Sequence, residues 1–295
     1  MLPSSTARRP HPGLARSLGG LVAVLTALPL LWVAGGAAAG GSRWAPADRA
    51  TITPGVQMFT AGAQCTGNFV FTDRRGRVYV GYAAHCAGLG EATDTDGCAT
   101  GSLPLGTRVR FASGADLVSR GTTHGFGRLA YSSWRTMAER GVRRANPCAH
   151  NDFALVRVGR KRVGKVNPTV PFWGGPTGVE VDGVDAGSRV HGYASSSLRP
   201  TDTLSPRTGV SLGRSAGGWA HDVYTATPGV PGDSGSGLLG PDGRAFGTLS
   251  TVAVAPVPGS NGVGDLAREL RFARRHSGID GLRLVRGTRP FEPIP

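Results

Sequence analysis

The chain has 295 residues, of which 33 are Lys or Arg and 19 are Asp or Glu, so its formal net charge is +14. Hydrophobic residues make up 39% and recur in short clusters, which argues against a disordered chain. The 47 glycines follow no G-X-Y repeat, so a collagen-like fibre is excluded, and the length suits one large domain or two small ones.

The first predicted element is an export signal at 1–39. An apolar stretch over 21–34 leads to three consecutive alanines that end at Ala39. Three basic residues precede it: Arg8, Arg9 and Arg16. A basic start, a short apolar centre and a small-residue cleavage site are typical of secretory signal peptides. An uncleaved membrane anchor is the alternative, which Pro29 disfavours. We therefore expect cleavage after Ala39, a secreted protein, and no stable membrane insertion afterwards.

Export bears on the four cysteines, Cys65, Cys86, Cys98 and Cys148. An even number of cysteines in a secreted chain favours two disulfides, and their spacing leaves all three pairings open. The chain has no CxxC pair and no HExxH motif, so the usual zinc-ligand spacing is missing. We expect neither a metal nor a cofactor.

From residue 57 onward, short β-rich runs alternate with turn residues. The runs 67–72 and 77–82 flank a turn in which Gly76 supplies a positive φ, and this pattern predicts a hairpin. Further strands are predicted at 108–111, 153–158, 190–193, 223–227, 236–239 and 245–254. Helices are predicted only at 132–141 and 264–276. Because no βαβ alternation is present, the pattern favours an all-β sandwich or a pair of barrels, connected through the Gly/Pro-rich stretch 163–178.

Three short segments combine residues that can carry chemistry. Ala-Ala-His85-Cys follows a predicted strand, Asn-Asp152-Phe-Ala-Leu-Val begins another, and Pro-Gly-Asp-Ser234-Gly-Ser-Gly forms a glycine-rich loop. Each alone has a plain structural explanation, such as a turn or a cap. Together they supply a nucleophile, a base to take its proton and an acid to orient that base, as acyl transfer by serine requires.

The order of these residues along the chain is informative. His precedes Asp and Asp precedes Ser, whereas subtilisin-type enzymes run Asp-His-Ser and α/β-hydrolases run Ser-Asp/Glu-His. A G-x-S-x-G elbow is also missing, because position 236 is Ser. The segments and their order resemble the chymotrypsin/trypsin-like serine proteases. The resemblance spans roughly residues 57–267, and the sequence as a whole is most similar to the secreted bacterial branch of this family.

This resemblance implies an all-β fold of two packed antiparallel six-stranded β-barrels with a C-terminal helix. It divides the chain into the signal 1–39, an N-terminal extension 40–55 and a protease domain 56–295. Within that domain the barrel halves would span roughly 56–162 and 168–265, and the helix and tail 265–295.

The resemblance also assigns roles to individual residues. Ser234 would be the nucleophile, His85 the general base and then acid, and Asp152 the group that fixes the His tautomer. The backbone N–H groups of Gly232 and Ser234 would form the oxyanion hole. Ser250 would support Asp152 and begin the substrate-binding strand.

Two disulfides and a substrate pocket follow from the same resemblance. It implies Cys65–Cys86 beside the catalytic His, and with it Cys98–Cys148. The pocket walls would include Pro228, Thr251 and Val252. Since Pro228 stands where a trypsin-like enzyme has its acid, we expect a neutral or apolar P1 residue in place of Arg or Lys.

One departure from the family pattern concerns Asp233. In the animal enzymes, the Asp before the nucleophile pairs with a newly exposed Ile/Val N-terminus, and nothing like it precedes Gln57 here. Asp233 therefore needs another cation, for which we expect an arginine that the sequence does not identify. Without such a partner the oxyanion loop would collapse.

Two rival site residues are less consistent with the motifs. Asp116 lies in what looks like an insertion at 102–144 and lacks an apolar strand after it, while His150 is the one other histidine near Asp152.

The motifs and the export signal together predict a secreted, monomeric serine endopeptidase acting on polypeptides. The alternative is a catalytically silent homologue that acts as a secreted binding protein. A specific nucleic-acid partner is not expected, because the arginines are dispersed along the chain.

Overall fold

The computed structural model describes residues 43–90, 95–199, 201–252 and 258–293, without the side chain of Val252, so the expected signal at 1–39 lies outside the described residues. No helix among the described residues is long and apolar enough to cross a membrane. The helices are α1 (Ser133–Glu139), α2 (Ala145–His150) and α3 (Leu266–His276).

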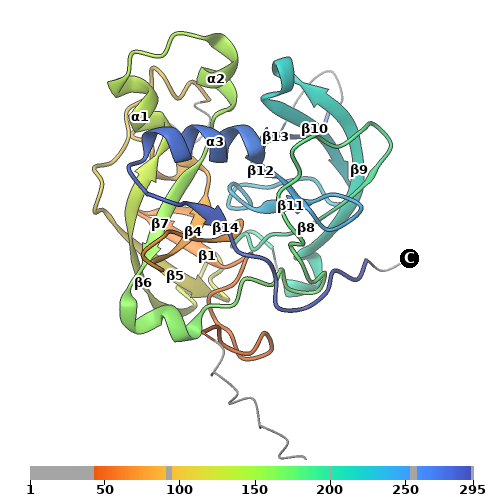
Figure 1. Ribbon diagram of the computed structural model, residues 1–295. Coiled ribbons are helices and arrows are strands. Elements are labelled where there is room, and N and C mark those ends of the chain that lie inside the picture. Colours follow the sequence, from red (N-terminus) through yellow and green to blue (C-terminus); the bar gives the residue numbers. More distant parts are fainter. Residues whose placement is uncertain (1–42, 91–94, 200, 253–257, 294–295) are drawn as a thin grey trace, which may run out of the picture. The chain divides into compact units, whose positions relative to one another are not determined.

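The second half of the chain forms a closed antiparallel barrel of six strands, in the order β10-β13-β12-β11-β8-β9 (Figure 1). The strands are β8 (Arg189–Tyr193), β9 (Pro206–Ser215), β10 (Ala220–Thr225), β11 (Gly237–Leu239), β12 (Ala245–Val252) and β13 (Asn261–Asp265). Buried side chains such as Val223, Phe246 and Leu249 form its core. Because closure pairs every strand on both sides, the barrel leaves no unpaired edge.

The first half forms a sheet in the order β14-β3-β4-β7-β6-β5-β1-β2. Its strands are β1 (Gln57–Thr60), β2 (Ala63–Thr66), β3 (Val70–Thr72), β4 (Val78–Tyr82), β5 (Arg108–Ser113), β6 (Thr122–Ser132), β7 (Ala154–Val158) and β14 (Arg283–Leu284). β2 and β3 are consecutive, yet β2 pairs with β1 at one end of the sheet and β3 pairs with β4 next to the other end, so one bent segment contributes to both sides of the sheet. Counting β2 and β3 as one strand and setting the short β14 aside leaves six strands, as expected for the first barrel.

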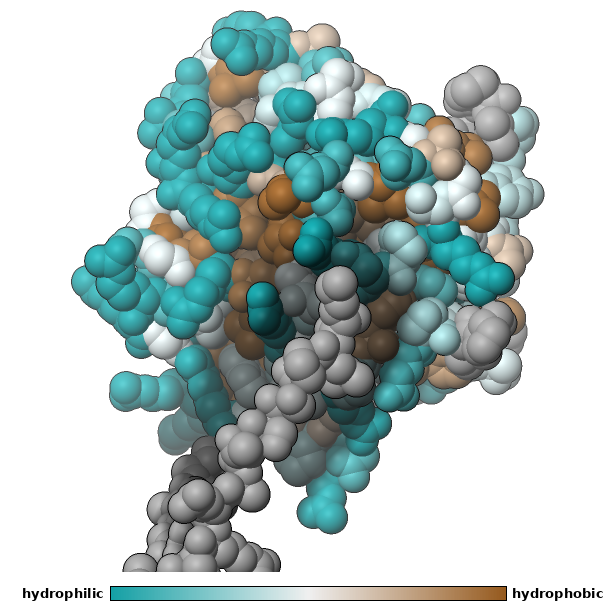
Figure 2. Space-filling view, turned by 45° about the vertical axis from the view of Figure 1, so that its right-hand side comes forward, coloured by the Kyte–Doolittle hydropathy of each residue, from teal (hydrophilic) through white to brown (hydrophobic). Residues whose placement is uncertain are grey.

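The interface between sheet and barrel is an apolar cluster. Phe71 and Phe153 of the first half lie edge-to-face, with ring centroids 5.5 Å apart, in the same cluster as Leu239 of the barrel. Leu266 and Leu270 of α3 belong to it as well, and Figure 1 shows α3 lying across the two halves. In Figure 2, hydrophilic residues cover most of the visible face, and hydrophobic ones gather toward its hollowed middle. The two halves are thus held together by buried aromatic and aliphatic side chains, the dominant favourable contribution to folding.

The expected all-β fold with a C-terminal helix is confirmed, and the predicted helices match α1 and α3. The interpretation of 102–144 as an insertion is wrong, because β5 and β6 within it are central strands of the sheet. The prediction missed the helix α2 and the short strands β1, β2 and β14. It also missed three longer strands, β6, β9 and β13. Each contains glycines that interrupt the alternation of apolar and polar residues on which strand prediction depends.

Candidate active site

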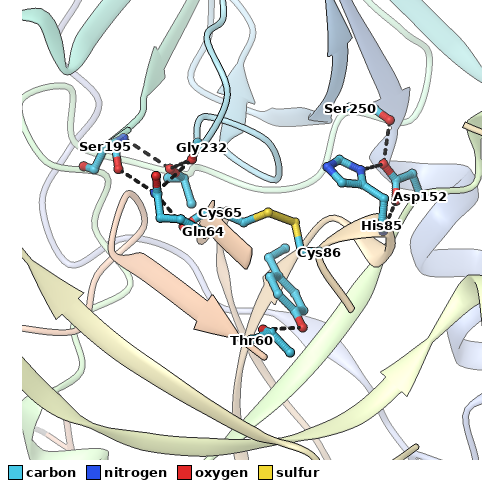
Figure 3. The surroundings of a disulfide bond; sticks show 11 residues. Thr60, Gln64, Cys65, His85, Cys86, Asp152, Ser195, Gly232 and Ser250 are labelled. Carbon is cyan, nitrogen blue, oxygen red and sulfur yellow. Dashed lines mark hydrogen bonds and ion pairs between the residues drawn. A yellow bond between two sulfur atoms is a disulfide. The ribbon is translucent and has the colours of Figure 1, made fainter. Parts of the chain in front are cut away.

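His85 lies directly after β4, in a 3₁₀ turn spanning Ala84–Ala87. The disulfide between Cys65 of β2 and Cys86 fixes this turn against the neighbouring strand. The His85 side chain is 13% exposed, so its ring is enclosed but reachable from solvent. Figure 3 shows the imidazole pointing away from the disulfide and toward Asp152.

Asp152 immediately precedes Phe153 and β7, and its side chain is almost fully buried. Its Oδ1 accepts the backbone N–H of His85 at 2.8 Å, and its Oδ2 lies 2.6 Å from His85 Nδ1. The hydroxyl of Ser250, from β12, donates to the same Oδ2 at 2.5 Å. Strands from both halves of the molecule therefore meet at one carboxylate, and the ring atom Nε2 of His85 is left for another partner.

The pair shifts the pKa values of both groups. Burial raises the pKa of Asp152, but the charge and hydrogen bonds of His85 and the Ser250 hydroxyl outweigh it and lower that pKa below 3.8. Burial lowers the pKa of His85, but the charge and hydrogen bond of Asp152 outweigh it and raise that pKa above 6.5. The His85 contribution to stability is therefore complete below pH 6.5 and lost as pH rises through its raised pKa, whereas that of Asp152 is present above pH 3.8 and lost as pH falls through its lowered pKa.

Ser234 is held close to His85 through β2. The backbone N–H of Thr66, next to Cys65, donates to the Ser234 carbonyl at 2.8 Å. A Cβ on the following residue, Gly235, would lie 2.6 Å from the Thr66 carbonyl and 2.7 Å from the nitrogen of Ala83, two residues before His85. The Ser234 hydroxyl makes no hydrogen bond to another described residue and is partly exposed. The structure therefore joins His85 to Asp152 directly, and it packs the loop that carries Ser234 against the segments beside His85 without a hydrogen bond between the Ser234 hydroxyl and the His85 ring.

The loop that carries Ser234 depends on Gly232. Its φ is +97°, and a Cβ there would lie 2.0 Å from Gln64 Oε1, so a larger residue is excluded. The Thr66 hydroxyl and the Gln64 amide donate to the Gly232 carbonyl at 2.8 and 3.2 Å. Figure 3 shows Gln64 beside Gly232. Among the described residues, the N–H groups of Gly232 and Ser234 have no acceptor, so both remain available for an oxyanion.

Asp233 has two cationic partners, where the sequence led us to expect one arginine. Its fully buried carboxylate contacts the Arg199 guanidinium, with Nε to Oδ1 at 3.3 Å, and lies 3.7 Å from Nη1 of Arg207. Both arginine side chains are at most 7% exposed. Burial lowers the pKa of Arg207 to about 10, an effect that Asp233 opposes and Arg199 reinforces, so Arg207 stays charged at neutral pH.

One part of the predicted pocket wall, at Thr227 and Pro228, lies next to this cation pair. The carbonyl of Pro228 accepts a hydrogen bond from Arg199 at 3.3 Å, and Arg207 donates to the carbonyl of Thr227 at 2.7 Å. Thr251 belongs to β12 and pairs with β13, while the side chain of Val252 lies outside the described residues. None of the predicted positions is acidic, and two buried cations contact the wall at Thr227 and Pro228.

A buried carboxyl that the motifs did not reveal lies behind Asp152. Glu269 of α3 is fully buried and accepts the Asp152 N–H at Oε1, 3.3 Å away. The Thr248 hydroxyl lies 2.9 Å from Oε2. Burial raises the pKa of Glu269 well above 4.5, and nearby Asp152 adds to this effect against the Thr248 hydrogen bond. The raised pKa favours the neutral form of Glu269, whose carboxyl holds the backbone of Asp152.

The rival site residues have other surroundings. His150 ends α2 and interacts electrostatically with Asp222, and burial lowers its pKa. Asp116 is exposed and accepts the N–H groups of Val118 and Ser119, which makes it a turn residue. Neither joins the cluster around Asp152.

The second disulfide, Cys98–Cys148, ties the segment after His85 to α2. Both predicted pairings are therefore present in the structure. Cys148 is four residues before Asp152, so this bond restrains the chain as it enters the site.

Comparisons with known proteins find no matching family model and no matching curated protein. Among solved structures, the chain is similar to Thermobifida fusca Protease A, at 18% identity and a TM-score of 0.47 over 80% of this chain and 99% of that one. It is similar to the Nocardiopsis protease, at 18% identity and a TM-score of 0.46 over 79% and 98%. It is also similar to the Cellulomonas bogoriensis chymotrypsin, at 18% identity and a TM-score of 0.45 over 80% of this chain and 98% of that one. These three similar structures are bacterial proteases, one of them a chymotrypsin.

Arg199→Met is expected to destabilise the protein by about 3 kcal/mol, because it leaves the buried Asp233 carboxylate without its nearest cation. Denaturant unfolding measures the change. Arg189→Met, which removes an exposed arginine, is the matched control and should shift the free energy of unfolding by less than about 0.5 kcal/mol. Equal stability of the two variants would contradict the role given to Arg199.

Glu269→Gln is expected to flatten the pH dependence of stability between pH 5 and 8. With native Glu269, the unfolded chain loses a proton above pH 4.5 that the native state keeps, so stability declines as pH rises. Gln is neutral in both states and can still accept the Asp152 N–H. The free energy of unfolding of Glu269→Gln, relative to that of the parent protein, should therefore increase as pH rises. Urea unfolding at a series of pH values measures it.

Glu269→Ala is the contrasting variant, since it leaves the Asp152 N–H without an acceptor and should destabilise the protein at every pH. If the stability of Glu269→Gln relative to the parent protein decreases as pH rises, Glu269 is ionised in the native state.

Proposed function

We propose that this protein is a secreted serine endopeptidase that cleaves polypeptides through His85, Asp152 and Ser234, with its catalytic domain at 56–295. The observation that supports it most is the buried Asp152 carboxylate, which binds both His85 Nδ1 and the His85 backbone and leaves Nε2 without a hydrogen-bond partner among the described residues. A histidine held in this tautomer can act as a general base toward a serine.

The chemistry follows from these positions. The Ser234 hydroxyl attacks the scissile carbonyl as His85 Nε2 removes its proton, and the negative charge that develops on the carbonyl oxygen is received by the N–H groups of Gly232 and Ser234. His85 then gives the proton to the leaving amine, which departs and leaves an acyl-enzyme on Ser234. Water, deprotonated by His85, then attacks the ester carbonyl. The bond between the acyl carbon and Ser234 Oγ breaks as His85 returns the proton to that oxygen, which releases the carboxylic acid product and restores the enzyme. Asp152 stabilises the imidazolium in both halves of the reaction.

The Asp233 ion pair supports activity over the silent-homologue alternative. That alternative depended on an Asp233 without a partner, whereas Arg199 and Arg207 both reach its carboxylate. Since these cations come from the chain interior, the loop does not need a newly cleaved N-terminus to hold it. We infer that activity requires no zymogen cleavage for this purpose.

Specificity and location are part of the same proposal. Arg199 and Arg207 flank the predicted pocket and disfavour a positively charged P1 residue, so we expect a neutral or apolar one. Two disulfides are typical of proteins that fold in an oxidising compartment, which fits secretion. We expect the enzyme to act as a monomer without a metal or cofactor.

A serine-directed fluorophosphonate probe tests the proposal. The parent protein should be labelled covalently, and Ser234→Ala should lose labelling by at least about a hundredfold because the nucleophile is gone. Ser236→Ala is the matched control, since Ser236 is buried in the same loop and should not react. Labelling that persists in Ser234→Ala, or that is missing from a folded parent, would reject the triad and favour the silent homologue.

A further inference from the structure

A groove lined by arginines crosses the first sheet. It encloses about 520 Å³ between the β3–β4 turn, the strands β5 to β7 and the segment that follows β7. Six arginines line it: Arg75, Arg77, Arg108, Arg128, Arg157 and Arg160. No acidic residue lines it. We call this feature the arginine groove.

Three of these arginines form a row in register. Arg108 of β5 is paired directly with Arg128 of β6, and Arg128 is paired directly with Arg157 of β7. Directly paired residues point to the same face of a sheet, and neighbouring strands are about 4.8 Å apart. All three side chains are exposed. Three positive charges thus follow one another across three adjacent strands.

These charges lack counter-charges within the part of the chain that the structure describes. Only Arg77 has a carboxylate partner, Asp73, among the six arginines of the groove. Arg108 instead lies over the ring of Phe126, 3.5 Å from its centroid, and Arg128 donates to the carbonyl of Gly106 at 3.0 Å. These contacts hold the guanidinium groups in place without neutralising them.

The row is not explained by the stability of the sheet. Like charges directly opposite each other on neighbouring strands destabilise a sheet, and here this happens at two successive pairs. Stability would favour an acid or a neutral residue at Arg128, the middle of the row. An anionic ligand that bridges the guanidinium groups would turn this repulsion into binding energy.

The groove lies apart from the candidate active site. It is formed at the start of β4, beside Val78, and at the end of β7, beside Val158. His85 follows the end of β4 and Asp152 precedes the start of β7. The two features therefore lie toward opposite ends of the same strands, so a ligand in the groove would leave the triad open.

We propose that the arginine groove binds a linear phosphodiester polymer that runs across β5, β6 and β7. Arginine recognises phosphate through paired N–H donors, and successive phosphates of a flexible chain can meet successive arginines of the row. A single phosphate could use only part of a row spread over three strands. A flat membrane surface fits poorly into a groove, whereas an extended chain can lie in it.

Fluorescence anisotropy with a fluorescein-labelled oligothymidylate of twelve nucleotides tests this proposal. For three phosphates contacted, the plot of log K against log salt concentration should have a slope of about −2. The triple variant Arg108→Gln/Arg128→Gln/Arg157→Gln should lose this slope and bind roughly a hundredfold more weakly at 0.1 M salt. Unlabelled inorganic polyphosphate should displace the probe from the parent protein.

The matched control removes the same charge elsewhere, with Arg120→Gln/Arg143→Gln/Arg271→Gln. These exposed arginines lie in three separate segments, so binding should change by less than threefold. Equal loss in both triple variants would show that net charge alone attracts the probe and would overturn the site. Binding to phosphatidylglycerol vesicles in place of the oligonucleotide would assign the groove to a membrane and overturn the proposal as well.

A second measurement separates binding from folding. Because the triple Gln variant relieves repulsion between neighbouring strands, its melting temperature at low salt should equal or exceed that of the parent. A clear fall in melting temperature would mean that the three arginines stabilise the sheet, and the argument for a ligand would fail.

Discussion

The burial of one carboxylate, that of Asp152, constrains the whole candidate site. A charge removed from water is costly unless hydrogen bonds and an opposite charge compensate it. At Asp152 that compensation comes from His85 after β4 and from Ser250 on β12, so the first sheet and the closed barrel must meet at a fixed distance. The interaction that orients the imidazole therefore also fixes how the two halves lie against each other.

The same constraint recurs at two other buried acids, with different solutions. Asp233 is compensated by two buried arginines, which keeps the loop around Ser234 in shape from within the barrel. At Glu269, burial raises the pKa and so favours the neutral form, and the carboxyl accepts the backbone N–H of Asp152. The three acids thus support the nucleophile loop, the base and the orienting group separately, each through contacts between segments distant in the chain.

This distribution explains what the sequence could predict. His85, Asp152 and Ser234 stand in short local motifs in a diagnostic order, so the candidate nucleophile, base and orienting acid could be proposed from the residues alone. Arg199 lies 34 residues from Asp233, and Glu269 lies 117 from Asp152, so their roles depend on the folded topology. The row formed by Arg108, Arg128 and Arg157 could not be predicted from the sequence either, because only the strand register brings the three residues together. The dispersed arginines of the sequence are gathered by the sheet.

The most direct test of the account is a titration of His85 by NMR of ¹⁵N-histidine-labelled protein. Because Asp152 outweighs the effect of burial, the pKa of His85 should lie above 6.5 in the parent and fall below 6.5 in Asp152→Asn, where burial acts without the charge. A His85 pKa below 6.5 in the parent, or one that Asp152→Asn leaves unchanged, would contradict the claim that the buried carboxylate organises the site.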